Sequence, residues 1–169
     1  VAADPATAVF RINLADALTA DGRAAEAQPL FEEAYRLQPD LAEAQRGLGE
    51  VALRNGDREG AARWFEKSTT GPAPSARGAN YLGYLRSQEG DRQGAIRAYE
   101  QALELDPGLD DVHRSLGILY AQEPADRARA VRHLEQSLTL APDQPGARQL
   151  RRLLERLRGK GRNRPGSGS

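Results

Sequence analysis

An internal period of 34 residues is the feature that most constrains this chain. A small residue, alanine once and glycine three times, recurs at this spacing, and a leucine precedes it each time. Columns of alanine, a large apolar residue and proline keep the same step, with a one-residue insertion in the fourth unit. The columns are Leu14, Leu48, Leu82 and Leu116; Ala15, Gly49, Gly83 and Gly117; Ala27, Ala61, Ala95 and Ala130; Phe31, Phe65, Tyr99 and Leu134; and Pro39, Pro107 and Pro142, with Pro72 and Pro74 at the remaining point. A period of this length indicates a repeat architecture built from one supersecondary unit per repeat.

Each unit has the spacing of two helices joined by a turn. Gly83 shares a helical face with two leucines, and Ala95 shares a face with Tyr99. We expect the small residues to let two helix backbones approach closely and the aromatic ring to fill the space beside them. Turn signals fall between the two helical runs, as Asp21-Gly22, Gly56-Asp57 and Gly90-Asp91. The pattern therefore predicts helical hairpins.

The combined columns resemble the tetratricopeptide repeat, over residues 8–142. The resemblance implies an all-α fold, a right-handed superhelical α-α solenoid of helical hairpins. It departs from the family pattern at Arg11, Gln45, Ala79 and His113, where a large aromatic is expected. The predicted organisation is a lead-in over 1–7, repeats over 8–41, 42–75, 76–109 and 110–142, a capping helix over 143–158 and a disordered basic tail over 159–169.

The capping helix is predicted from its own apolar stripe. A repeat buries its apolar face only against its neighbours, so the last repeat needs a cover. Leu150, Leu153, Leu154 and Leu157 follow the spacing of an amphipathic helix. The following segment, "GKGRNRPGSGS", has no apolar residue to bury, which is why we expect it to be disordered.

Composition excludes several classes of protein. No run approaches the roughly 18 apolar residues of a membrane-spanning helix, and the absence of cysteine excludes disulfides and thiolate metal sites. The chain contains no methionine, so we expect it to be processed or excised from a longer protein. The basic residues are arginines except for Lys67 and Lys160, a bias associated with bacterial genomes rich in G and C. The compartment stays open between cytoplasm and periplasm.

No constellation of residues predicts chemistry. Asp111, His113 and Ser115 cannot form a triad, because helical residues two apart point in nearly opposite directions. Asp110 and His113 share a face, but two ligands without a third do not make a metal site. The stretch "GLGEVA" over 47–52 matches a dinucleotide fingerprint on paper, yet it falls inside a periodic helix and not after a strand. We therefore predict no catalytic residue, no metal, no cofactor and no small-molecule substrate.

The resemblance implies that first-helix positions line a concave groove that binds a peptide or a partner protein. Tyr84 offers a stacking face with a polar tip, and Asn80 can both donate to and accept from a peptide backbone. The Lys/Asn/Asn/Lys/Arg constellation with which chaperone-binding members grip a C-terminal carboxylate is absent. The predicted binding residues are Arg46, Glu50, Arg54, Arg77, Asn80, Tyr84, Arg114 and Gln122.

Two alternatives to a non-catalytic interaction scaffold stay open. The chain could be an accessory repeat domain of a larger bacterial enzyme. It could also bind nucleic acid or an anionic membrane surface through its C-terminal segment, where eight basic residues and one acid lie between Arg148 and Arg164. No aromatic residue alternates with these arginines, and the rest of the chain is acidic, so the sequence favours neither nucleic acid nor membrane as the partner.

Overall fold

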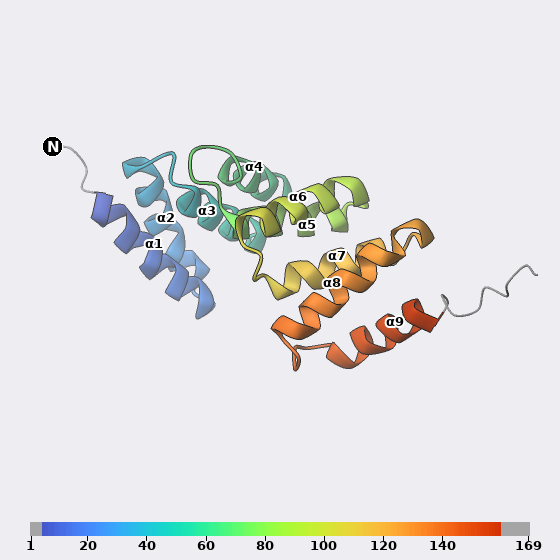
Figure 1. Cartoon of the computed structure of the whole chain (residues 1–169). Helices are drawn as coiled ribbons and strands as arrows, with labels where there is room; N and C mark the ends of the chain where they lie inside the picture. The colour runs from blue at the N-terminus through green and yellow to red at the C-terminus, as the bar shows by residue number, and fades with distance from the viewer. Residues whose placement is uncertain (1–4, 160–169) are drawn as a thin grey trace, which may run out of the picture. The chain divides into compact units, whose positions relative to one another are not determined.

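The computed structural model describes residues 5–159, and this part of the chain is entirely helical apart from turns. The chain divides into two compact units at the boundary between Leu105 and Asp106. The first unit contains α1 (Pro5–Ala20), α2 (Ala24–Leu37), α3 (Ala42–Arg54), α4 (Arg58–Ser68), α5 (Ala76–Gln88) and α6 (Arg92–Leu105). The second contains α7 (Asp110–Tyr120), a short 3-10 helix (Pro124–Asp126), α8 (Arg127–Leu140) and α9 (Ala147–Gly159). Figure 1 shows the helices as consecutive hairpins, α1 with α2, α3 with α4, α5 with α6 and α7 with α8.

The Gly-Asp turns predicted from the sequence end one helix and begin the next. Gly56 and Gly90 have φ values of 82° and 80°, a left-handed conformation that follows the ends of α3 and α5. Glycine adopts this conformation at little energetic cost because it has no Cβ. The aspartate that follows then caps the second helix: the Asp57 carboxylate accepts a hydrogen bond from the Gly60 amide, and that of Asp91 from the Gly94 amide, both at 2.8 Å.

The small-residue columns pack as predicted. A Cβ added to Gly49 would lie 2.5 Å from the Phe65 ring, and one added to Gly83 would lie 2.6 Å from Tyr99. In the second unit, a Cβ on Gly117 would lie 2.7 Å from Leu134. Each distance is far below van der Waals contact, so the two helices of a hairpin approach closely only because glycine has no side chain.

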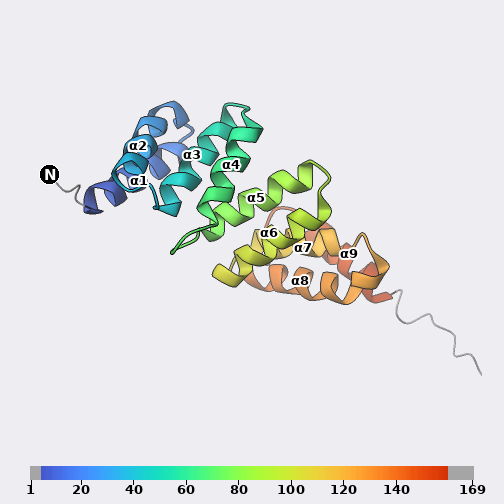
Figure 2. The same cartoon turned by 90° about the horizontal axis from the view of Figure 1, so that it is seen from above.

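The aromatic column also connects successive hairpins of the first unit. Phe31 of α2 lies against Gly47 of α3, where an added Cβ would be 2.2 Å from the ring. Phe65 of α4 stacks on Tyr81 of α5, with ring centroids 4.9 Å apart and planes 8° apart. Figure 2 shows α2, α3 and α4 as neighbours in this unit. Phe65 therefore holds both the first helix of its own hairpin, at Gly49, and the first helix of the next hairpin, at Tyr81.

The last helix, α9, packs its apolar face on α8. Leu150 and Leu154 of α9 are buried with Leu134 of α8, and Leu153 and Leu157 pack around them. The helix begins at Ala147 and not at 143, because Pro145 and Gly146 intervene; Gly146 has a φ of 85°, which falls outside the helical region. It ends at Gly159, and the remaining residues of the predicted disordered tail lie outside the described residues.

The opposite end of the chain differs from the sequence prediction in where its first helix begins. Helix α1 begins at Pro5, inside the predicted lead-in. Its outer side carries Val9, Phe10 and Leu14, which are 47%, 67% and 43% exposed. Within residues 5–159, no helix is both long enough and apolar enough to cross a membrane.

Candidate functional site

Polar and aromatic side chains line one side of the first helices α1, α3 and α5. Along α3 and along α5 they are spaced three or four residues apart, which places them on one helical face. Hydrogen bonds join the three helices on this side: Arg46 of α3 donates to Asp16 of α1, and the Ser75 hydroxyl, just before α5, donates to Glu43 of α3 at 2.8 Å. We call this surface the α1/α3/α5 face; its residues include Asp16 of α1, Glu43, Arg46, Glu50 and Arg54 of α3, and Arg77, Asn80 and Tyr84 of α5.

Among the residues of this face, Arg46 is buried. Its side chain is only 2% exposed, although arginine is almost never buried unless it is paired. The guanidinium donates two hydrogen bonds to the Asp16 carboxylate at 2.7 and 2.8 Å, one to Glu43 at 2.6 Å and one to Glu50. Arg46 thus holds three carboxylates in place, one of them from another helix.

The charges around Arg46 do not balance. Burial lowers the pKa of the guanidinium, but the negative charges of Glu50 and Asp16 and the hydrogen bond to Asp16 outweigh it, so its pKa is raised. Tyr81 lies beside the same cluster, where burial, followed by the charge of Glu50, raises the pKa of its hydroxyl. One arginine against three carboxylates leaves negative charge at the surface, where Asp16 and Glu43 are 35% and 46% exposed.

Six of the eight predicted binding residues come together on the first unit. Arg54 is exposed at the end of α3 and donates to the Thr19 carbonyl at 3.3 Å. On α5, Arg77 is exposed, Asn80 is half-buried and Tyr84 is 44% exposed. The remaining members of this set are Arg46 and Glu50, described above.

The other two predicted binding residues belong to the second unit. Arg114 of α7 donates to the side-chain oxygen of Gln144 at 3.0 Å, and Gln144 in turn donates to the Ser137 carbonyl and hydroxyl. Gln122 is exposed and follows the end of α7. Arg114 therefore also supports the loop between α8 and α9.

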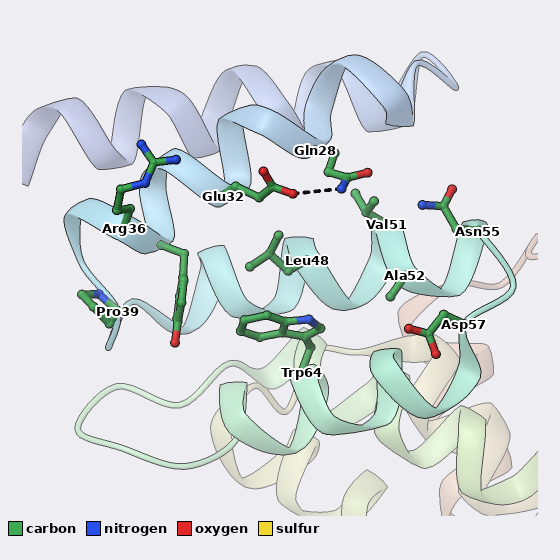
Figure 3. A pocket seen from close by; sticks show the side chains of 11 residues that line it. Gln28, Glu32, Arg36, Pro39, Leu48, Val51, Ala52, Asn55, Asp57 and Trp64 are labelled. Carbon is green, nitrogen blue, oxygen red and sulfur yellow. Dashed lines mark hydrogen bonds between the residues drawn. The ribbon is translucent and has the colours of Figure 1, made fainter.

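A pocket of about 670 Å³ opens on another side of α3, between α2 and α4 (Figure 3). Leu48, Val51 and Ala52 of α3 form its floor, and Trp64 of α4 lies along one edge. Glu32 stands over the floor from α2, with its carboxylate accepting a hydrogen bond from Gln28 at 2.9 Å. The remaining lining residues are Tyr35, Arg36, Pro39, Asn55 and Asp57. This pocket was not predicted from the sequence. Its signal in the sequence is a difference from the next repeat: Ala52 is small where that repeat has Arg86, and Trp64 is large where that repeat has Ala98.

The residues that the sequence analysis weighed as a catalytic triad form hydrogen bonds within the fold. The Ser115 hydroxyl donates to the Asp111 carbonyl at 2.8 Å, and Nδ1 of His113 lies 3.0 Å from Nδ1 of His133, a pairing that the sequence did not predict. In the described part of the chain, no group of three or more histidine or acidic side chains is arranged to hold a metal ion. Gly47 and Gly49, from the dinucleotide-like stretch, contact Phe31 and Phe65.

The basic face of α9 is exposed. Arg148, Arg152 and Arg156 follow one another at intervals of four residues on its solvent side. Arg158 pairs with Glu135 of α8 at 2.5 Å, and Arg151 donates to the Pro142 carbonyl at 2.6 Å. Because the apolar face of α9 packs on α8, the helix has no free apolar side for insertion into a membrane.

Helical hairpins with a 34-residue period, small-residue columns within each hairpin and a capping helix define an α-α repeat protein. Comparison with known families agrees. The family described as "Tetratricopeptide repeat" matches residues 12–77, and that described as "TPR repeat" matches residues 83–123. The chain belongs to the tetratricopeptide repeat family. Its members are generally non-catalytic scaffolds for protein interactions.

Solved structures of similar fold include several bacterial proteins. PilF of Pseudomonas aeruginosa is 22% identical with a TM-score of 0.75, over 92% of this chain and 69% of that one. YrrB, described as a TPR protein with an unusual peptide-binding site, is 20% identical with a TM-score of 0.69, over 93% and 79%. MamA is 21% identical with a TM-score of 0.66, over 87% and 84%. At these identities the likeness concerns the fold. No curated protein matches the chain in sequence.

Proposed function

We propose that the chain is a non-catalytic scaffold whose α1/α3/α5 face binds a peptide segment of a partner protein. The observation that carries the proposal is the exposure of Tyr84 beside Arg77. The two lie seven residues apart, on the same side of α5, and a large aromatic ring that is 44% exposed is a common anchor at protein interfaces. The description of YrrB as a peptide-binding TPR protein supports the same kind of function.

The charge and burial of each residue of the face indicate its role in binding. Arg46 is buried and engaged, so we assign it the role of positioning Asp16, Glu43 and Glu50. These carboxylates would attract basic groups of the ligand, while Arg54 and Arg77 would attract acidic ones. Asn80 and Tyr84 would contact the peptide between the two. A segment that carries both charges therefore fits the face better than a uniformly charged one.

On the second unit, Arg114 and Gln122 would make their own contacts with the partner, and Arg114 also donates to Gln144. The position of the chain within a larger enzyme, the alternative raised by the sequence, is compatible with the same peptide-binding role.

The test starts from a random peptide library displayed on phage and selected against the whole chain. The binding of the selected peptides is then measured for Arg77→Ala/Tyr84→Ala and for the control Arg97→Ala/Leu105→Ala. The control removes an exposed arginine and a 39% exposed leucine from α6, outside the face. We expect the first variant to weaken binding at least tenfold and the control to leave it within about twofold. Equal affinity for both variants would contradict the proposal.

A further inference from the structure

The pocket between α2 and α4 has a counterpart one repeat later, between α4 and α6. A shift of 34 residues aligns Ala52 with Arg86, Glu32 with Glu66 and Trp64 with Ala98. At the first pair, the earlier repeat has the small alanine and the later repeat has the long arginine. At the last pair, the earlier repeat has the large tryptophan and the later repeat has the small alanine. The same architectural position is therefore built with different side chains in the two places.

In the later position, an arginine of the chain itself occupies the space. Arg86 extends from α5 to Glu66 of α4, and its guanidinium nitrogen lies 3.0 Å from the carboxylate oxygen. Its Cδ lies against Gly94 at the start of α6, 2.9 Å from where a Cβ would be. The Arg86 side chain is only 28% exposed, so this space is filled by its stem and its charge is neutralised.

In the earlier position, the same elements are present without the arginine. Ala52 ends at its Cβ, and Glu32, the counterpart of Glu66, accepts a hydrogen bond from Gln28 of its own helix. The space that an arginine stem fills in the next repeat is here part of the pocket of about 670 Å³. Figure 3 shows this opening above Leu48 and Ala52, between Glu32 and Trp64.

We propose that this pocket binds an arginine side chain of a partner protein. The aliphatic stem would lie on Leu48 and Val51, and the guanidinium would pair with Glu32, as Arg86 pairs with Glu66. The binding surface is distinct from the α1/α3/α5 face and lies on a different side of α3. The proposal therefore goes beyond the function proposed above and does not depend on it.

Trp64 and the rim charges favour arginine over other side chains. The indole ring takes the place of Ala98, and a planar guanidinium stacks on such a ring while it donates to a carboxylate at its edge. Asp57 adds a second negative charge at one end of the pocket, whereas Arg36 lies at the Pro39 end (Figure 3). The guanidinium is therefore expected between Glu32 and Asp57. A purely apolar side chain would leave these carboxylates unused.

Trp64 is the only tryptophan of the chain, so its fluorescence reports on the pocket directly. The experiment titrates the whole chain with blocked tripeptides of sequence acetyl-Leu-X-Leu-amide, where X is arginine, lysine, glutamine or leucine. We expect a saturable change in Trp64 emission with the arginine peptide, at millimolar affinity, and binding of the glutamine and leucine peptides weaker by about fivefold. Glutamine or leucine peptides that bind as well as arginine would overturn the proposal, as would the absence of a saturable change.

Four variants make the result specific. Glu32→Gln should abolish the preference for arginine over glutamine, whereas Glu59→Gln, a carboxylate of α4 that is 92% exposed and outside the pocket, should preserve it. Ala52→Arg should place the chain's own guanidinium in the pocket and remove the response. Arg77→Ala/Tyr84→Ala should leave it unchanged, which separates this site from the α1/α3/α5 face. Retention of the arginine preference in Glu32→Gln would contradict the assignment.

Discussion

The ring of Phe31 occupies the place where a side chain of Gly47 would lie, in the following repeat. An added Cβ on Gly47 would be 2.2 Å from that ring, and Phe31 itself is fully buried. This contact joins α2 to α3 and so connects two successive hairpins. The contact of Gly49 with Phe65, by contrast, joins the two helices of one hairpin. Two glycines two residues apart thus face two aromatic rings on opposite sides of α3, which explains why the helix tolerates both.

Gly47→Ala should therefore destabilise the chain. Alanine favours a helix over glycine by about 1 kcal/mol, but overpacking against Phe31 costs about 1–3 kcal/mol, so a net loss is expected. The free energy of unfolding in urea measures it. Gly159→Ala is the control, since nothing lies within 4 Å of its Cβ position, and it should be neutral or stabilising. A stabilised Gly47→Ala variant would show that the helices are not held at this separation.

Equivalent leucines of different repeats should differ in their contribution to stability. Leu14 and Leu82 occupy the same column, yet Leu14 is 43% exposed on the outer side of α1 and Leu82 is 4% exposed. Leu82→Ala should lower the free energy of unfolding by about 2–5 kcal/mol, and Leu14→Ala by less than about 1 kcal/mol. Similar losses from both variants would mean that the outer side of α1 is covered in solution.

Arg46→Met should be strongly destabilising because it leaves three carboxylates without their shared cation. Breaking a buried pair costs about 3–5 kcal/mol, and the exposure of Asp16 and Glu43 reduces the expected loss to about 2–4 kcal/mol. Arg46→Lys should recover little, because an ammonium cannot reproduce the fork of hydrogen bonds. Urea unfolding tests both, with the exposed Arg97→Met as control. Full stability of the lysine variant would indicate that charge alone is needed.

Alkaline pH should weaken the first unit through Tyr81. Its pKa is raised in the folded chain above the ordinary 10.0, so the protonated hydroxyl favours folding. This contribution is complete below pH 10 and is lost as pH rises through the folded pKa. The free energy of unfolding, measured from about pH 8 to 11, should fall less steeply in Tyr81→Phe than in the parent chain. A slope in Tyr81→Phe equal to that of the parent chain would refute this effect.

Most of the fold followed from periodicity. Close packing of two helices restricts the size of the side chain at a few positions, such as Gly83 and Tyr99. Because these positions recur in every repeat, their periodicity predicts the hairpins. Helix boundaries were less accessible, since the start of α9 at Ala147 depends on the conformation of Gly146. The contact between Phe31 and Gly47 was also missed, because Gly47 has no glycine at the matching positions of the other repeats.

The candidate site could be predicted only in outline. Helical spacing places Arg46 with Glu50 and Arg54, but burial of Arg46 depends on Asp16, which lies 30 residues away on another helix. The pocket beside Trp64 shows in the sequence only as a difference from the next repeat, at Ala52 and Trp64, and not as a motif of its own. The His113 and His133 pair likewise depends on the packing of α7 against α8.

Site-specific photocrosslinking can locate a peptide bound to the α1/α3/α5 face. Benzoylphenylalanine is placed at Gln88, exposed at the end of α5 one turn beyond Tyr84, and in a separate chain at Leu105 of α6. Each chain is irradiated with a peptide selected from the library. We expect the peptide to be captured from position 88 and not from position 105. Capture from position 105 alone, or equally from both, would contradict binding at the α1/α3/α5 face.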